Sequence, residues 1–223
     1  MKGCQALKKE NSVKNLVLLA MLTAVSYVAV ALIRVPVVLF LSYEPKDVII
    51  TIGAFLLGPM AGVIVSVAVA LLEMLSISQT GPIGALMNFL SSAVFACTAA
   101  FVYKKKRTLG GAVLGLLAGS VLMIGAMLLW NYLITPLYMT GTSRAEVAAM
   151  LIPVFLPFNA LKAGLNSAFV LGLYKPLVRA LRKAGLVQAA QAQATGAKLG
   201  VYVLSAILLI TCILLLLVYQ GKI

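Results

Sequence analysis

Histidine is absent from this sequence, and acidic side chains are rare, with five Asp and Glu among 223 residues. The commonest general base and proton carrier is therefore missing. The sequence also contains no G-x-x-x-x-G-K-[ST] loop, no nucleophile elbow and no paired metal ligands. We therefore expect a protein that is not an enzyme, with no catalytic residues, no metal site and no cofactor. If it moves a solute uphill, a separate subunit must supply the energy.

Cysteine is also scarce. Cys4, Cys97 and Cys212 are far apart and lack the spacing of metal ligands. We expect them to pack as small apolar side chains.

Charge is low throughout the chain. Only 10% of the residues are charged and 63% are hydrophobic, whereas about 25% of a soluble domain is charged. The mean hydropathy is +1.10. Several apolar stretches reach the roughly 20 residues that a helix needs to cross a bilayer. Because lipid offers no partner to free backbone groups, the sequence predicts an all-α integral membrane protein.

The net charge of +13 would suit a nucleic-acid partner, but the basic residues gather beside the apolar stretches. Three clusters stand out: Lys2, Lys8, Lys9 and Lys14; Lys104, Lys105, Lys106 and Arg107; and Lys175, Arg179, Arg182 and Lys183. This pattern is typical of cytoplasmic loops, which also attract anionic lipid headgroups. We therefore expect a multi-pass membrane protein with a cytoplasmic N-terminus, in contact with lipid and not with nucleic acid.

Turn signals and basic clusters divide the apolar sequence into six expected spans. They cover about residues 13–33, 47–57, 61–77, a stretch from Pro82 to Tyr103, 109–133 and 150–173. Six crossings put all three basic clusters on one side. The second span is short for a crossing, and the loops at 34–46 and after 133, with Pro136 and Arg144, are expected outside.

Three regions follow from this division. Residues 1–183 are the expected six-span membrane domain, and 184–200 form an Ala/Gln-rich linker. The apolar stretch 201–219 is expected to be an extra C-terminal transmembrane helix, with an interfacial helix as the alternative.

Several polar residues lie inside the spans, where ionisable groups are costly and mark functional sites. Asn159, Lys162 and Asn166 share one face of the sixth span, with Lys162 near its middle. By residue count the others lie in the outer half of the membrane: Asp47, Glu73, Asn88, Asn131 and Thr135. The sequence therefore predicts a polar cup that opens outward. The alternative is structural: Lys162 pairs with Glu73 or Asp47, and the asparagines bridge helices.

Two faces of small residues allow close helix approach. Ala20 and Ala24, with Ala31 near the same face, lie on the first span, and Gly111, Gly115 and Gly119 lie on the fifth. Each face can serve internal packing or the docking of another membrane subunit.

Five segments, in order, resemble the S components of energy-coupling factor (ECF) transporters: residues 44–48, 58–62, 81–89, 131–138 and 157–166. The last two, NYLITPLY and PFNALKAGLN, are similar to the riboflavin-specific members of that family. The resemblance covers about residues 13–180.

The resemblance implies a six-helix ECF S-component bundle in a bacterial plasma membrane. It also implies that residues 1–183 are the substrate-binding domain, which binds riboflavin from outside as a transported ligand. Flavin mononucleotide remains open as a further ligand. It also implies docking onto a transmembrane coupling subunit and two ATP-binding subunits, with Ala20 and Ala24 matching the family's A-x-x-x-A contact. The expected ligand-binding residues are Asp47, Asn131, Asn159 and Lys162 by motif, and Asn88, Thr135, Tyr43 and Leu86 around them.

Two alternatives stay open at this stage. The chain could be an S component for another vitamin, such as pantothenate or thiamine, or it could be a non-transporting membrane scaffold. The apolar stretch near the C-terminus departs from the family pattern.

Overall fold

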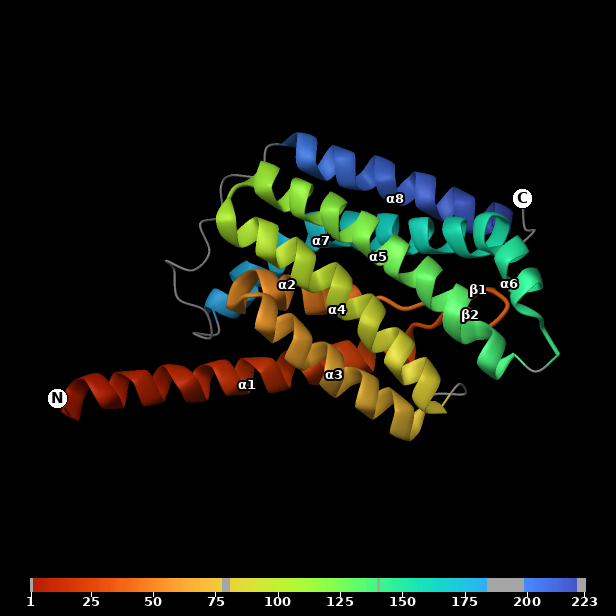
Figure 1. Cartoon of the computed structure of the whole chain (residues 1–223). Coiled ribbons are helices and arrows are strands. Elements are labelled where there is room, and N and C mark those ends of the chain that lie inside the picture. The colour runs from red at the N-terminus through yellow and green to blue at the C-terminus, as the bar shows by residue number, and fades with distance from the viewer. Residues whose placement is uncertain (1, 78–80, 140, 184–198, 220–223) are drawn as a thin grey trace.

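The computed structural model describes residues 2–77, 81–139, 141–183 and 199–219, which form an elongated bundle of helices (Figure 1). In chain order the elements are α1 Lys2–Leu32, β1 Val35–Val38, β2 Leu41–Tyr43, α2 Lys46–Leu57, α3 Pro59–Ser76, α4 Gly81–Lys105, α5 Leu109–Tyr138, α6 Arg144–Met150, a π-helix Leu151–Phe155, α7 Leu156–Lys183 and α8 Leu199–Tyr219.

The predicted all-α membrane architecture is confirmed. Within the described residues, five helical stretches are long and apolar enough to cross a membrane: Val13–Leu32, Pro59–Ser76, Gly81–Lys105, Leu109–Leu137 and Arg144–Leu181. Helix α2 has 12 residues, which span roughly 18 Å at the helical rise and fall short of a bilayer. It is instead enclosed by its neighbours.

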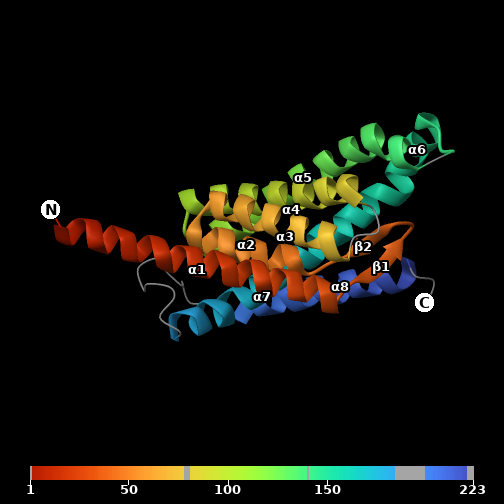
Figure 2. The ribbon, with the colours of Figure 1, turned by 90° about the horizontal axis from the view of Figure 1, so that it is seen from below.

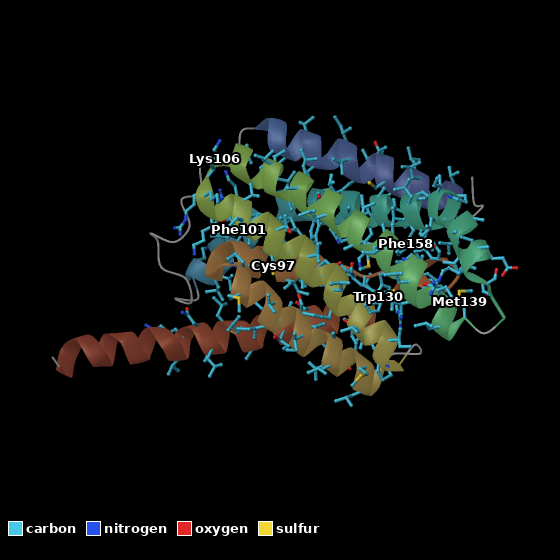
Figure 3. All side chains as sticks on the ribbon, viewed as in Figure 1. Cys97, Phe101, Lys106, Trp130, Met139 and Phe158 are labelled. Carbon is cyan, nitrogen blue, oxygen red and sulfur yellow. The ribbon has the colours of Figure 1, made fainter. Side chains whose placement is uncertain are left out.

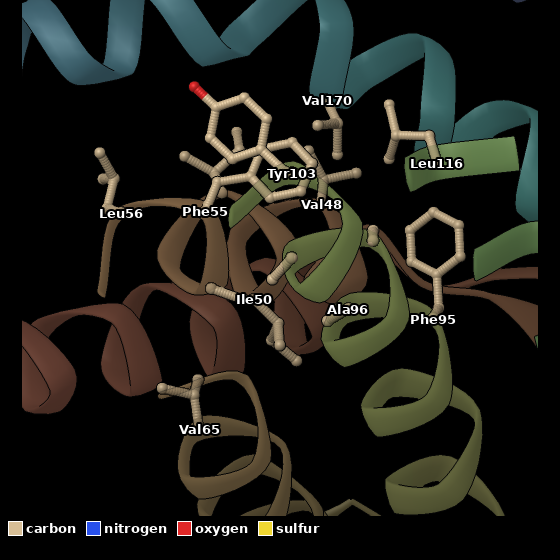
Figure 4. Packing of buried hydrophobic residues seen from close by; sticks show 14 of the residues in the cluster. Val48, Ile50, Phe55, Leu56, Val65, Phe95, Ala96, Tyr103, Leu116 and Val170 are labelled. Atoms are coloured by element: carbon tan, nitrogen blue, oxygen red, sulfur yellow. The ribbon is translucent and has the colours of Figure 1, made fainter. Parts of the chain in front are cut away.

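Helix α2 forms the centre of the bundle, and ten of its residues are buried. Its Phe55 ring stacks on Tyr103 of α4, with ring centroids 4.5 Å apart (Figure 4). The helix ends at Gly58, whose φ of 101° suits glycine, and Pro59 begins α3. The predicted Gly-Pro turn therefore folds α3 back along α2.

The glycines of α5 pack against the backbone of α4. A Cβ atom at Gly115 would lie 2.5 Å from the Ala99 carbonyl oxygen, and one at Gly119 would lie 2.7 Å from that of Phe95. At Gly111 a Cβ atom would lie 1.9 Å from the Lys106 carbonyl oxygen, in the connection between the two helices. Of the two alternatives for this face, the structure shows internal packing.

The C-terminal end of α5 differs from the prediction. We expected the fifth span to stop at residue 133 and Pro136 to lie in a loop, but the helix continues through Pro136 to Tyr138. A proline removes one backbone donor and strains the turn before it. Within the last turn of a helix embedded in the bundle, that loss does not end the helix.

The segment before α7 is also helical. Ser143 and Glu146 form a capping box that starts α6, and the π-helix then leads into α7. At its other end α7 extends beyond the predicted limit near residue 173, through Pro176 to Lys183. The third basic cluster therefore lies on a helix and not in a loop.

A β-hairpin replaces the simple loop expected between the first two spans. Strands β1 and β2 are antiparallel, and Leu39 at the turn has a φ of 50°. The hairpin lies at the end of the bundle opposite the N-terminal end of α1, the α4–α5 turn and the C-terminal end of α7 (Figure 1). The three basic clusters thus gather at one end and the hairpin at the other.

The expected seventh helix is present as α8, which lies alongside α7 (Figure 2). Its 21 residues span roughly 31 Å, close to the hydrocarbon thickness of a bilayer. Of the predicted linker, residues 184–198 lie outside the described part of the chain.

Substituting Gly115 with alanine will destabilise the bundle, because the new methyl group meets a backbone oxygen of α4 that cannot move aside. We expect a loss of about 1–3 kcal/mol, seen as a lower unfolding temperature in detergent. Gly125 on the same helix has open space at its Cβ position, so Gly125→Ala is the matched control. Equal unfolding temperatures for the two variants would contradict this account of the α4–α5 contact.

Candidate functional site

A polar cavity lies at the hairpin end of the bundle, the end at which Phe158 lies, opposite Lys106 (Figure 3). Its lining comes from the hairpin segment and from α4, α5 and α7: Arg34, Phe40, Leu41, Ser42, Glu44, Met87, Asn88, Ser91, Met127, Asn131, Phe158, Asn159 and Lys162. Four of the residues predicted to bind ligand are among them: Asn88, Asn131, Asn159 and Lys162.

Lys162 at this cavity is held by a buried ion pair with Asp47. Its Nζ lies 3.1 Å from Asp47 Oδ2 and donates to Ser91 Oγ at 3.1 Å. The Asp47 carboxylate also accepts from Ser92 Oγ at 2.5 Å and from Asn166 Nδ2 at 3.1 Å. Asp47, not Glu73, is therefore the partner of Lys162, and it lies behind the amine and does not line the cavity.

A second ionic network ties the hairpin segment to the helices. Lys46 Nζ lies 2.6 Å from Glu44 Oε2 and 2.6 Å from Glu73 Oε1, and its side chain is buried. Arg34 Nε lies 3.2 Å from Glu44 Oε1, and Asn88 Nδ2 donates to Glu73 Oε2 at 2.9 Å. Asn88 thus bridges α4 and α3, as expected of an asparagine within a membrane bundle.

The two networks balance their charges. They hold three cations and three anions, Arg34, Lys46 and Lys162 against Glu44, Asp47 and Glu73. A buried ion is tolerable only when a partner and further hydrogen bonds compensate its lost hydration. The two networks therefore place polar atoms at the cavity, and each of their charged groups has a partner of opposite charge.

The other predicted polar residues form hydrogen bonds within their own helices. Asn131 Nδ2 donates to the Met127 carbonyl at 2.7 Å, and its Oδ1 accepts from Thr135 Oγ1 at 3.0 Å. Asn159 Nδ2 donates to the Phe155 carbonyl at 2.8 Å. These bonds orient the two amides that line the cavity, whereas Thr135 lies behind Asn131 and does not line it.

Tyr43 and Leu86, which we expected beside a ligand ring, do not line this cavity. Tyr43 is buried in a separate apolar cluster, and Leu86 is 53% exposed, in a groove between α3 and α4. One residue along a helix turns the side chain by about 100°, so Met87 and not Leu86 faces the cavity. Phe40, Met87 and Phe158 supply its apolar walls.

The cavity is narrow, with a volume of about 30 Å³. Pockets that hold a drug-sized ligand have roughly 300–1,000 Å³. A ligand of that size enters only if lining side chains move apart. The hairpin segment is the part of the lining that can move without displacing a long helix.

A larger groove in the described part of the chain has a different character. It has a volume of about 500 Å³ between α1, α2 and α7, and its lining consists of apolar side chains such as Leu22, Val48 and Leu177. Since it offers no polar group to orient a ligand, we do not take it as the functional site.

The family model for the substrate-specific component of ECF transporters matches residues 14–174. This chain is an ECF transporter S component. The match ends within α7, so the S-component region contains the hairpin, the cavity and both ionic networks.

Two curated relatives are both named riboflavin transporters. The chain is 30% identical to "Riboflavin transporter RibU" of Staphylococcus aureus (strain TCH60), over 76% of this chain and 93% of that protein. It is 30% identical to "Riboflavin transporter FmnP" of Bacillus subtilis (strain 168), over 67% of this chain and 84% of that one. A solved structure of the S component of a bacterial ECF transporter is 31% identical, with a TM-score of 0.65, and the alignment covers 77% of this chain and 99% of that one.

Sequence reasoning missed several residues of this S component's cavity. Ser91 lies three positions after Asn88 and therefore on the same helix face, a spacing that could have revealed it. Arg34, Phe40 and Glu44 come from the hairpin segment, for which no helical period exists. Their position depends on the ionic network with Lys46.

Breaking the pair between Asp47 and Lys162 will destabilise the S component. We expect Asp47→Asn or Lys162→Met alone to cost about 3–5 kcal/mol, because each leaves one buried charge without its partner. The double variant will lose less than the two single losses added. Thermal unfolding in detergent measures this, with Lys104→Met at an exposed site as the control. Additive losses would show that the two side chains do not interact.

Proposed function

We propose that this chain is the riboflavin-binding S component of an ECF importer, which captures riboflavin at the outer membrane face for ATP-driven uptake. The observation that carries the proposal is the polar cavity around Lys162, Asn131 and Asn159 at the hairpin end. The names of the curated relatives supply the ligand. Riboflavin is a transported ligand and not a cofactor in this account.

The lining suits the chemistry of riboflavin. Riboflavin has a flat, largely apolar ring system that carries carbonyl and imide groups at one edge. A polyol tail is attached to the ring system. Phe40, Met87 and Phe158 offer apolar walls, and the amides of Asn131 and Asn159 offer donors and acceptors. Because riboflavin is neutral, the balanced charges around the cavity suit it.

Lys162 has a donor to spare for the ligand. An ammonium group carries three N–H bonds, of which Asp47 and Ser91 account for two. The third can donate to a ring or ribityl oxygen. Asp47, which we predicted to contact the ligand, is instead proposed to hold Lys162 in place.

The location of the cavity supports capture from outside. Basic clusters favour the cytoplasmic side, so we propose that the hairpin and the cavity, at the opposite end of the bundle, face outward. Riboflavin would enter as the hairpin segment moves aside, since the closed cavity is far smaller than the ligand. Flavin mononucleotide would bring a phosphate for which the two ionic networks hold no unpaired cation.

Transport requires partners, because the sequence has no P-loop. We propose that a transmembrane coupling subunit and two ATP-binding subunits supply the energy. Ala20 and Ala24 are exposed on α1, which leaves this small-residue face free for the coupling subunit. ATP hydrolysis in the partners would then reorient the loaded bundle toward the cytoplasm.

The purified S component will bind riboflavin and show its visible absorbance. Asn159→Ala will weaken riboflavin binding by about tenfold, the effect of losing one buried hydrogen bond. Leu86→Ala, at a lipid-facing position on α4, is the matched control and will bind within twofold of the unchanged protein. Fluorescence titration with riboflavin measures both.

The same titration tests the alternatives. If the protein binds pantothenate or thiamine and not riboflavin, that vitamin is the ligand. If it binds none of the three, a scaffold is favoured. Equal affinities for the Asn159 and Leu86 variants would place the site outside this cavity.

Enlarging the small-residue face of α1 will disrupt assembly without preventing capture. We expect Ala20→Leu combined with Ala24→Leu to lower co-purification with the coupling and ATP-binding subunits at least fivefold, because the leucines keep the two backbones apart. Riboflavin affinity will stay unchanged. Ala160→Leu, at an exposed alanine of α7, is the control, and equal recovery of partners in both variants would exclude this face.

A further inference from the structure

Helix α8 lies outside the part of the chain that the S-component family model matches, which ends at residue 174. It is nevertheless packed along α7, and its far end reaches β1 of the hairpin (Figure 2). This additional helix therefore contacts both α7, which carries cavity residues, and the hairpin, whose turn and second strand supply part of the cavity lining.

The face of α7 toward α8 is shaped to receive it. A Cβ atom at Gly164 would lie 2.8 Å from Cys212 Sγ, and one at Gly172 would lie 3.0 Å from Ser205 Oγ. Ser205 Oγ donates to the carbonyl of Ala168 at 2.7 Å, and both side chains are buried. Gly164, Ala168 and Gly172 repeat every four residues, a spacing that lets two membrane helices approach closely. The two helices are thus fitted to each other.

At its outer end α8 shares an apolar cluster with the hairpin. Leu216 of α8 packs in one cluster with Val35 and Val37 of β1 and with Tyr43 of β2. Leu161 of α7, next to the cavity lysine, belongs to the same cluster. The hairpin is therefore held from two sides, by the Lys46 network and by the outer end of α8.

We propose that α8 is a buttress that holds the β1–β2 hairpin closed over the cavity and slows the release of the bound vitamin. The proposal rests on the proposed function for the identity of the ligand. The hairpin must move before a ligand leaves a cavity of this size. Apolar area buried between α8 and the hairpin is lost during that movement, which raises the barrier to opening. Leu216 is then a positioning residue, which acts through the hairpin.

The contact between α8 and α7 is tested first. In Gly164→Cys the new Cβ atom would lie 2.8 Å from Cys212 Sγ. In a disulfide, roughly 3 Å separates the Cβ atom from the opposite sulfur. In a background with Cys4→Ser and Cys97→Ala, oxidation with copper phenanthroline will join the two helices, seen as a mass loss of about 2 Da from the two hydrogens removed on closing the bond. Gly125→Cys, on α5, will not cross-link. Failure of the Gly164 variant to cross-link would overturn the proposal.

The effect on release is tested with a matched pair of variants. We expect Leu216→Ala to speed riboflavin dissociation roughly fivefold, since interface changes act mainly on the dissociation rate. Leu215→Ala, at the neighbouring position that is 53% exposed, will leave the rate within twofold. Recovery of riboflavin fluorescence after dilution measures both rates. Equal rates would overturn the buttress.

Hairpin opening can be measured without riboflavin. A Ser42→Cys variant in the same background places a thiol on β2 facing the cavity, and the parent with Cys212 alone gives the background signal. Leu216→Ala will speed its labelling by a membrane-impermeant maleimide about as much as it speeds release, whereas Leu215→Ala will not. Faster labelling in a protein that does not bind riboflavin would refute the proposed function and retain the buttress. If Leu216→Ala leaves the labelling rate unchanged in a protein that binds riboflavin, the buttress is refuted and the proposed function is retained.

Discussion

The bundle depends on the compensation of charges that lie inside it. Low-dielectric surroundings make a lone ion several kcal/mol unfavourable, so every charge in the interior needs a partner at short range. Lys46 and Asp47 are neighbours in sequence, yet each joins a different network, one with Glu44 and Glu73 and the other with Lys162. The first turn of α2 therefore links the base of the cavity to the hairpin segment above it.

This arrangement explains why α2 is short. A helix that faces lipid must be long enough to cross the bilayer, but a helix enclosed by protein can be shorter. Because α1, α3, α4 and α7 surround it, α2 can begin inside the bundle, with two charged residues in its first turn. The hairpin then fills the space above it and supplies Glu44 and part of the cavity lining.

Much of this S component could be predicted from its sequence. Hydropathy and basic clusters predict the long helices, and the i, i+3, i+7 spacing correctly puts Asn159, Lys162 and Asn166 on one buried face. The hairpin and the continuation of α5 through Pro136 could not be predicted, because they depend on contacts between distant segments. Helix α6 was missed although its capping box of Ser143 and Glu146 is a local signal. Residues 86 and 87 show what a sequence motif leaves open: it identifies the turn of helix, but only the packing shows that Met87 lines the cavity.

The pairing of Asp47 with Lys162 also bears on how the chain becomes embedded in the membrane. These residues are separated by 115 positions, so the carboxylate of α2 has no amine partner until α7 has been synthesised. A segment of 12 residues with two charges is also a poor substrate for independent insertion. Biogenesis must therefore leave α2 outside the hydrocarbon, or shelter it within the translocation machinery, until the later helices arrive.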